Sequence, residues 1–294
     1  MDPIVGNAAS SSHQVNTANP AQGVVGGQSV TTRQSQGGHS AGGDVASLET
    51  SHAEAPTGLK AKPSAQEIYD HFKGDYKSDD RSKPYEIMKE VTKDKISFDT
   101  EKPSLNGIQN RAYQALKNMP MTLRHYSTNQ QTKGQEPPFK SIASNFELVH
   151  NGVKELSGGS SSNTNQKDWT HCGNTAFTFF LVSIDGQVSD KAKFLDNCTH
   201  YAEIDLSSDS AKSLGEIWAS KDLLDERDLG SAVAIKGTPT EFKDLICLHL
   251  AKKGALGMNV DAKNAVEKLD TAVFKGLPEV KVPGSVQVAE WKAK

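Results

Sequence analysis

The stretch "AFTFFLVSIDG", residues 176–186, is a continuous apolar run with three phenylalanines, and it lies between Asn174 and Gly186. A run that does not alternate between apolar and polar residues is typical of a strand that is covered on both faces. We therefore expect this stretch to lie inside a sheet, with other elements packed on both sides of it.

Three other stretches predict strands. Residues 121–127 form a short candidate strand after a helical stretch, and "THYAEIDL" (199–206) alternates between polar and apolar residues, which is typical of a half-buried strand. The tail from 278 to 291 is also strand-like, with prolines that interrupt it. Strands spaced by irregular loops, without a regular alternation of strand and helix, predict an α+β fold.

The second half of the chain contains helical periodicity at 211–226, 237–254 and 261–276. The second of these stretches begins with a capping box over 238–241, has proline at its first helical position and ends at a glycine, so both of its ends are encoded locally. The stretch "SIASNFELV" (141–149) fits either a strand or a short helix, and its sequence does not decide between them.

Residues 64–119 contain three short helical patterns, and the first begins with a capping box formed by Ser64 and Glu67. We interpret them as a helical subdomain that precedes the main domain, residues 120–294. Its expected role is either that of a scaffold or that of a docking surface for a substrate protein.

The first 60 residues differ from the rest in composition. Serine, glycine, glutamine, asparagine, alanine and valine dominate, Arg33 is the only lysine or arginine before Lys60, and no aromatic residue occurs before Tyr69. Such a segment cannot bury enough apolar surface to offset the entropy lost on ordering. We therefore expect residues 1–60 to be a disordered leader.

The overall charge argues against nucleic acid and membrane partners, and the spacing of the cysteines argues against disulfides and a zinc site. The formal net charge of −3 gives no general attraction to nucleic acid or to an anionic membrane, and no apolar run approaches the length needed to cross a bilayer. The three cysteines, Cys172, Cys198 and Cys247, lack a Cys-x-x-Cys spacing, which argues against a disulfide framework and a zinc site. We expect reduced thiols, no metal site, and neither nucleic acid nor a membrane as partner.

One candidate for chemistry is a thiol site. Cys172 lies just before the apolar run, with His171 next to it, but adjacent residues on an extended chain point to opposite faces. A nucleophilic thiolate would need another base, such as His200 or His249. A cysteine hydrolase or deamidase that uses Cys172 is therefore one alternative function.

Three motifs, taken in order, resemble those of a known family. They are "LRHYST" (123–128), "HCGNTAFTFFLVSIDG" (171–186) and "LLDERDLGSAV" (223–233). Their order resembles that of bacterial type III effector ADP-ribosyltransferases, in which a strand that ends in histidine or arginine precedes a "GNT-x-F-x-FF" strand and an acidic helix start. Within that class the chain resembles the CteC-type family, which ADP-ribosylates a threonine of host ubiquitin. The resemblance covers about residues 120–255 and implies a split sheet, mixed or antiparallel, of the ADP-ribosyltransferase type.

The resemblance implies that NAD is bound as a substrate and that its nicotinamide–ribose bond breaks through an oxocarbenium-like centre. The ribose, the carboxamide and the pyrophosphate need hydrogen-bonding groups, and the nicotinamide ring needs an aromatic side chain to stack on. The candidate NAD-binding residues are Arg124, His125, Tyr126, Ser127, Asn174, Thr175, Phe179 and Phe180. His125 is also a candidate catalytic residue.

A carboxylate is needed to stabilise the sugar cation and to orient or deprotonate an acceptor hydroxyl. Glu203 lies on the polar face of the alternating strand, whereas Glu226 lies in the late acidic motif, so both are candidates. Neither belongs to the paired Glu-x-Glu or Gln-x-Glu pattern of arginine-directed and asparagine-directed toxins. That absence favours a hydroxyl acceptor.

The sequence thus predicts an NAD-dependent protein mono-ADP-ribosyltransferase that modifies a host protein. The resemblance implies a threonine of ubiquitin as the acceptor, and a block of ubiquitin signalling as the consequence. A leader rich in serine and glycine without a cleavable signal is typical of type III secretion substrates, so we expect secretion by a bacterium into the host cytosol. A non-catalytic effector that binds a host protein is the remaining alternative.

Overall fold

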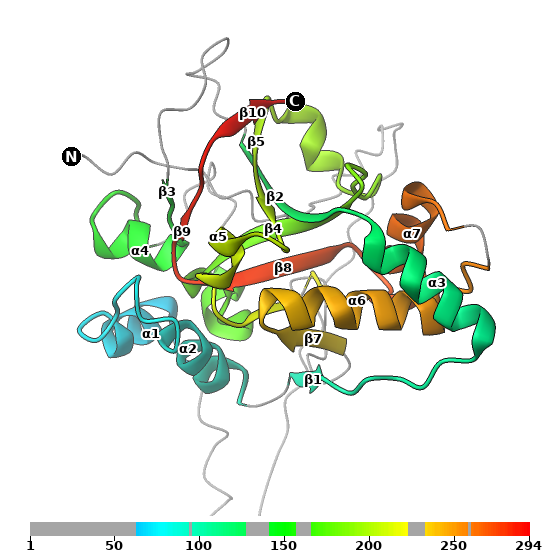
Figure 1. Ribbon diagram of the computed structural model, residues 1–294. Coiled ribbons are helices and arrows are strands. Elements are labelled where there is room, and N and C mark those ends of the chain that lie inside the picture. The colour runs from blue at the N-terminus through cyan, green and yellow to red at the C-terminus, as the bar shows by residue number, and fades with distance from the viewer. Residues whose placement is uncertain (1–62, 94–95, 128–140, 157–165, 223–232, 258–259) are drawn as a thin grey trace, which may run out of the picture. The chain divides into compact units, whose positions relative to one another are not determined.

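The computed structural model of the chain describes residues 63–93, 96–127, 141–156, 166–222, 233–257 and 260–294. The predicted leader, residues 1–60, lies outside these stretches. Within them helices and strands are mixed along the chain, so the predicted α+β class is confirmed (Figure 1).

Most of the strands belong to one sheet. Among the described residues, eight strands lie in the order β1-β7-β6-β8-β4-β2-β5-β10. Neighbouring strands are antiparallel except for β1 and β7, which are parallel, so the sheet is mixed. The strands are β1 (Ser97–Asp99), β2 (Met121–Ser127), β4 (Phe177–Ile184), β5 (His200–Asp205), β6 (Ile217–Lys221), β7 (Val233–Gly237), β8 (Pro278–Pro283) and β10 (Trp291–Ala293), with β3 (Ser141–Ile142) and β9 (Val286–Gln287) as a separate pair.

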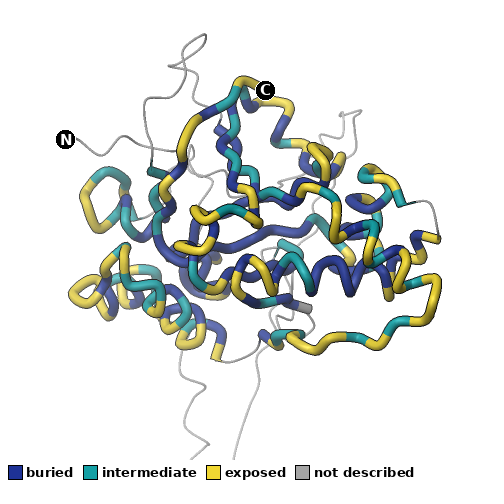
Figure 2. The backbone as a smooth tube through the Cα atoms, in the orientation of Figure 1, coloured by how far each residue is buried: buried dark blue, intermediate teal, exposed yellow. Residues whose placement is uncertain are grey.

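β4 is the strand that the apolar run 176–186 predicted. It pairs with β8 on one side and with β2 on the other, and every one of its residues is buried. Figure 2 shows the same burial along the neighbouring strand β8. The prediction that this strand is covered on both faces is confirmed.

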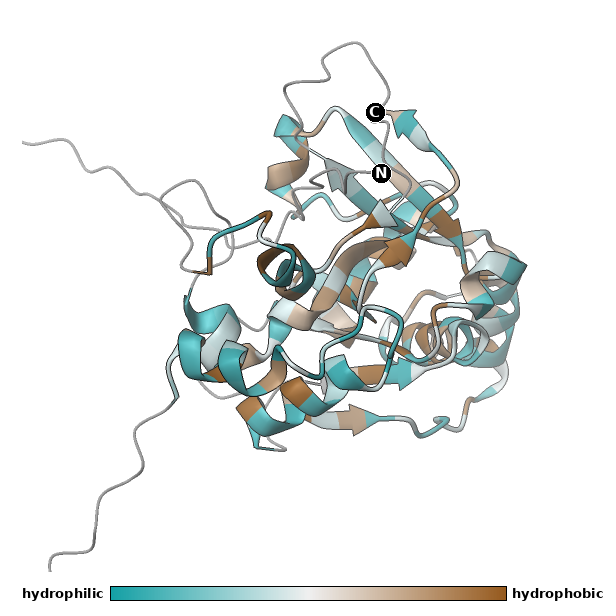
Figure 3. Ribbon diagram, turned by 90° about the vertical axis from the view of Figure 1, so that its left-hand side faces the viewer, coloured by the Kyte–Doolittle hydropathy of each residue, from teal (hydrophilic) through white to brown (hydrophobic). Residues whose placement is uncertain are grey.

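Different elements cover the two faces of the sheet. The helices are α1 (Ala65–Phe72), α2 (Lys83–Thr92), α3 (Gly107–Asn118), α4 (Asn145–His150), α5 (Asp209–Lys212), α6 (Pro239–Lys253) and α7 (Ala262–Lys268), with short turns η2 (Asp168–Cys172), η3 (Asn174–Ala176), η4 (Lys193–Asn197) and η6 (Leu269–Val273). On one face α3, α6 and α7 pack on the strands in the main core, which includes Val280 and Val282. On the other face Met88 of α2 packs with Phe179 and Trp218 in a second core. Figure 3 shows apolar residues concentrated along the strands between these helices.

The three helices predicted within 64–119 form, but they belong to two clusters. α1 and α2 share an apolar cluster with α4, in which Phe72, Ile87 and Phe146 are buried. α3 instead packs along α6 in the main core (Figure 1). A separate helical subdomain is therefore not confirmed.

The helix predicted over 211–226 is wrong for residues 213–222, and residues 223–226 lie outside the described residues. α5 is a single turn, and the chain then enters β6, where Trp218 lies opposite Lys236 on β7 and Lys281 on β8. Gly215, between the two elements, has a φ of +68°, a left-handed conformation that ends the helix. Pairing with two other strands thus overrides the helical periodicity of this stretch.

The undecided stretch 141–149 contains both structures, since β3 is followed directly by α4. The locally encoded helix is confirmed as α6, where the Glu241 carboxylate accepts hydrogen bonds from the backbone N–H and the hydroxyl of Thr238. Short-range capping therefore predicted the ends of α6 correctly, because its hydrogen-bond partners lie within one turn.

The strand β2 lies between β4 and β5, but it keeps only β5 as a partner toward its C-terminal end. Over Met121–Arg124 it pairs with β4, and over Thr122–Ser127 it pairs with β5. The part of β4 beyond this contact, Phe177–Phe180, pairs with β8 instead. After Arg124 the sheet therefore divides into two parts, β2-β5-β10 and β4-β8-β6-β7-β1.

A tight turn leads the chain into β4. Gly173, between η2 and η3, has a φ of +61°, and a Cβ atom at this position would lie 2.7 Å from the Cα atom of Met88 on α2. Glycine alone combines the left-handed backbone with this close approach. The glycine of the "GNT" motif is therefore required for the packing of α2 against the turn.

We predict that Gly173→Ala lowers the free energy of unfolding by about 3 kcal/mol, because backbone strain and a steric clash add together. Gly152→Ala is the matched control, since Gly152 also has a positive φ (+68°) but has no atom within 4 Å of the added Cβ. It should lower the same quantity by about 1 kcal/mol. Urea denaturation of both variants measures the difference, and equal losses would contradict the packing role.

Candidate functional site

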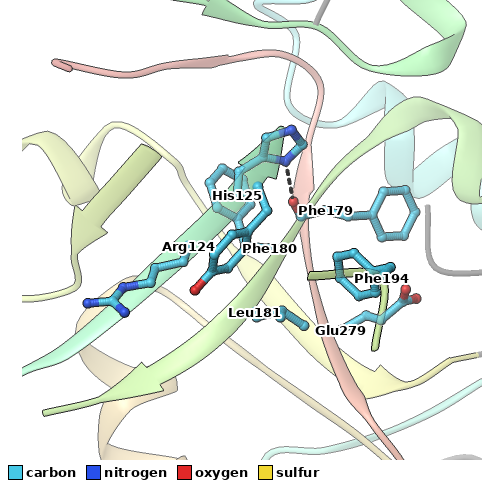
Figure 4. A pocket seen from close by; sticks show the side chains of 8 residues that line it. Arg124, His125, Phe179, Phe180, Leu181, Phe194 and Glu279 are labelled. Atoms are coloured by element: carbon cyan, nitrogen blue, oxygen red, sulfur yellow. Dashed lines mark hydrogen bonds between the residues drawn. The ribbon is translucent and has the colours of Figure 1, made fainter. Parts of the chain in front are cut away.

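A pocket opens where β2 and β4 part. Its empty volume of about 290 Å³ includes space open to solvent, and Figure 4 shows the side chains around it. It is lined by Arg124, His125, Tyr126, Phe179, Phe180, Leu181, Phe194 and Glu279. All except Leu181, Phe194 and Glu279 are candidate NAD-binding residues from the sequence.

His125 bridges the gap between the diverging strands. Its Nδ1 lies 2.7 Å from the carbonyl oxygen of Phe179 (Figure 4). Because a carbonyl oxygen can only accept, Nδ1 carries the proton and Nε2 is the unprotonated nitrogen. The residue is 3% exposed, and its ring lies edge-on to Phe180 and Trp291. Burial lowers the pKa of His125 to about 4, so the imidazole is neutral at neutral pH.

The second imidazole nitrogen of His125, Nε2, is buried and has no hydrogen-bond partner among the described residues. A neutral imidazole accepts at this nitrogen. His125 therefore holds the two strands together through one nitrogen, while the other is a buried acceptor without a partner in the described ranges.

The side chain of Arg124 lies on the face of β2 opposite that of His125, and neighbouring residues hold it there. Its Nε donates to the Glu203 carboxylate at 2.6 Å, and its Nη1 donates to the carbonyl oxygen of Gly186 at 2.9 Å. The guanidinium also lies over the ring of Tyr201, 4.7 Å from its centroid. These contacts fix the side chain at the pocket wall with little freedom to move.

Glu203 is the partner of two cations and does not line the pocket. Besides Arg124, the Nζ of Lys292 donates to its carboxylate at 3.1 Å. Burial raises the pKa of Glu203, but the bonds from Arg124 and Lys292 outweigh burial, so that the pKa lies below its ordinary value. The carboxylate is therefore ionised, and it also accepts a hydrogen bond from the hydroxyl of Thr122 at 3.2 Å.

Aromatic side chains form much of the remaining wall. Tyr126 and Phe179 lie on the two diverging strands, whereas Phe194 lies on η4, in the connection from β4 to β5. The sequence did not predict Phe194, because nothing in its local pattern distinguishes it from a core phenylalanine. Much of the pocket surface is therefore aromatic.

Glu279 gives the pocket a carboxylate that the sequence did not predict. It lies on β8, is 4% exposed, and its Oε2 is 3.4 Å from the Nζ of Lys281. In Figure 4 the carboxylate lies on the side of the pocket opposite Arg124. The signal that could have found it is "PEVKVP" (278–283), where two charges alternate with valines in a strand that is buried on both faces.

Ser127, Asn174 and Thr175, which the sequence also predicted as site residues, are not among the residues that line the pocket. Ser127 ends β2 beside β5, and its carbonyl oxygen accepts from the N–H of Thr199. Asn174 and Thr175 form the buried turn ahead of β4, where the Nδ2 of Asn174 lies 3.4 Å from Asp168. The other candidate carboxylate, Glu226, lies outside the described residues.

Cys172 does not line the pocket, and its thiol is buried in the second core, where the residue is 1% exposed. Burial raises its pKa to about 12, so the thiol stays protonated at neutral pH and is a poor nucleophile. The imidazoles of His171 and His200 each hydrogen-bond to the threonine that precedes them, and Nε2 of His249 lies 3.7 Å from Asp99. These features weigh against a cysteine hydrolase.

No group of three or more histidine, cysteine, aspartate or glutamate side chains is placed to hold a metal ion within the described ranges. The helices in those ranges are also too short or too polar for any of them to cross a membrane. The sequence matches no protein-family model, and it matches no curated protein.

The buried His125 predicts a specific loss of stability in acid. Its pKa in the folded state, about 4, lies below the ordinary value of 6.5, so the folded state favours the neutral ring. The contribution of this neutral ring to the free energy of unfolding is complete above pH 6.5. It is lost as the pH falls toward 4, by at most about 1.4 kcal/mol per pH unit. We expect His125→Gln to flatten the dependence of the unfolding free energy on pH over this window.

The exposed His150 on α4 provides the control. His150→Gln should keep the wild-type slope between pH 6.5 and pH 4, as measured by urea denaturation at a series of pH values. If His125→Gln also keeps that slope, the buried neutral ring is not the source of the acid sensitivity.

Proposed function

We propose that the chain is an NAD-dependent protein mono-ADP-ribosyltransferase. The observation that supports this best is the position of the pocket: it opens where the sheet divides. There the fold brings together Arg124, His125, Tyr126, Phe179 and Phe180, which the sequence resemblance had assigned to NAD. The divided sheet also fits the split sheet that the resemblance implies.

The size of the pocket limits which part of NAD enters it. The empty volume of about 290 Å³ includes space open to solvent, so the enclosed part is smaller, and the pocket would take at most one end of the dinucleotide. Its aromatic walls suit the nicotinamide ring, and Nε2 of His125 suits a ribose hydroxyl. The adenosine end would then lie outside the pocket.

In the proposed reaction the bond between the nicotinamide nitrogen and C1′ of the ribose breaks, and nicotinamide leaves with the bonding electron pair. A new bond forms between C1′ and the oxygen of an acceptor hydroxyl, whose proton passes to a carboxylate and then to water. The carboxylate also stabilises the positive charge that develops on the sugar before the new bond is complete.

Three carboxylates are candidates for this role. Glu279 lines the pocket, Glu203 is bound to Arg124 and Lys292, and Glu226 lies outside the described residues. The geometry favours Glu279, because a carboxylate must face the reacting sugar to stabilise its charge. In this arrangement Glu203 acts indirectly, by holding Arg124 at the wall.

The acceptor and the setting follow from the resemblance. We propose a threonine hydroxyl of host ubiquitin as the acceptor, and secretion by a bacterium into the host cytosol. The composition of residues 1–60 supports the secretion route, since a polar segment with few charges is typical of type III substrates.

Incubation of the protein with biotinylated NAD and ubiquitin tests this function. We expect biotin on ubiquitin, and we expect Glu279→Gln to lower the initial rate about 100-fold, because the carboxylate acts on the reacting centre. His125→Gln should lower the rate as well, whereas Cys172→Ala, which removes a buried thiol outside the pocket, should retain it. Each variant is first shown to unfold cooperatively in urea.

The outcomes separate the candidate functions and carboxylates. A rate that survives Glu279→Gln but is lost in Glu226→Gln would move the catalytic carboxylate to the late acidic motif. Loss in Cys172→Ala alone would support the thiol alternative. If the wild-type protein neither labels ubiquitin or any other protein of a host lysate nor releases nicotinamide from NAD, the transferase proposal is wrong.

A further inference from the structure

Lys281 is the one charged residue among the largest fully buried side chains of the described ranges, with an exposed fraction of 0%. It lies on β8, opposite Phe179 of β4 on one side and Trp218 of β6 on the other. Its neighbours Val280 and Val282 lie in the main core. Because side chains alternate along a strand, Lys281 points to the opposite face, into the second core.

The ammonium of Lys281 contacts two residues that line the pocket, Glu279 and Phe179. Its Nζ lies 3.4 Å from Oε2 of Glu279 and 3.3 Å from Oγ of Ser220. It also lies 5.4 Å from the ring centroid of Phe179 and 4.8 Å from that of Trp218. Glu279 and Phe179 line the pocket, whereas Lys281 does not.

Packing alone does not account for a lysine at this place. Removing an ammonium and a carboxylate from water is unfavourable, and apolar side chains of similar size often stabilise a core as well as a buried ion pair does. Strands that are covered on both faces are normally apolar throughout. The ion pair between Lys281 and Glu279 instead fixes the position of the Glu279 carboxylate at the pocket wall.

We propose that Lys281 is a positioning residue of the pocket. Its ammonium holds the Glu279 carboxylate toward the ligand, and it supports the Phe179 ring through a cation–π contact. The carboxylate so placed suits a ligand that develops positive charge beside a flat ring. The ribosyl-nicotinamide end of NAD is such a ligand, and for the identity of the ligand this inference rests on the proposed function.

The kinetic test measures release of nicotinamide from NAD. We expect Lys281→Met to lower kcat about 10–100-fold, because a small displacement of a catalytic group is costly, with KM for NAD changed less than about threefold. Lys281→Arg retains the charge and should lose less. In a Glu279→Gln background, Lys281→Met should have a much smaller further effect, since no carboxylate remains to be placed and only the support of the Phe179 ring is lost.

The matched control is Lys154→Met. Lys154 is a partly buried lysine whose Nζ lies 2.6 Å from Oδ1 of Asn145, outside the pocket. Its removal should leave kcat unchanged. An additional loss on Lys281→Met in the Glu279→Gln background, equal to the loss in the wild-type background, would overturn the positioning role.

Crystal structures of the variants test the same inference without NAD. The Glu279 carboxylate should leave the pocket wall in Lys281→Met and keep its position in Lys281→Arg. If it stays in place in Lys281→Met, the inference is wrong whatever the ligand is. If Lys281→Met does not fold, Lys281→Gln, which also lacks the charge but keeps a donor for Ser220, serves the same comparison. Should wild-type protein fail to cleave NAD, the proposed function fails while these structures still decide the role of Lys281.

Discussion

One hydrogen bond spans the place where the sheet divides. Beyond Arg124 the strand β2 follows β5 and the facing part of β4 follows β8, so no backbone ladder joins them there. The imidazole of His125 donates to the carbonyl oxygen of Phe179 across that gap. Without this bond a buried carbonyl would lack its partner, which costs about 1–3 kcal/mol. The pocket exists because the strands separate, and it keeps its shape because His125 limits the separation.

Each of the two walls of the pocket carries a charged side chain that is held by an ion pair. Arg124 on β2 is fixed by Glu203, and Glu279 on β8 is fixed by Lys281, so each wall has a charged group that already has a partner of opposite sign. Groups held in this way need little rearrangement when charge develops in a ligand, and such preorganisation is what electrostatic stabilisation requires. The difference between the walls is burial: Arg124 and Glu203 are partly open to solvent, whereas Lys281 is enclosed by Phe179 and Trp218.

Two elements were predictable because the pattern that identifies them lies within the element itself. The apolar run of β4 and the capping residues of α6 give the correct structures, because burial on both faces and one-turn hydrogen bonds leave a direct pattern. β6 was predicted as a helix, since its apolar spacing fits a helical period and its identity as a strand depends on β7 and β8. The predicted helices of residues 64–119 form as well, but α3 joins α6, a partner more than 100 residues later in the chain.

The sequence by itself determined the residue types of one wall of the pocket, because Arg124, His125 and Tyr126 are consecutive and Phe179 and Phe180 lie within the apolar run. Only the tertiary structure decided the other wall. Glu279 reaches the pocket because β8, close to the end of the chain, pairs with β4, and Phe194 reaches it on the turn η4. Strand pairing over such a separation leaves no local pattern in the sequence, since the free energy that selects it comes from burying distant apolar side chains together.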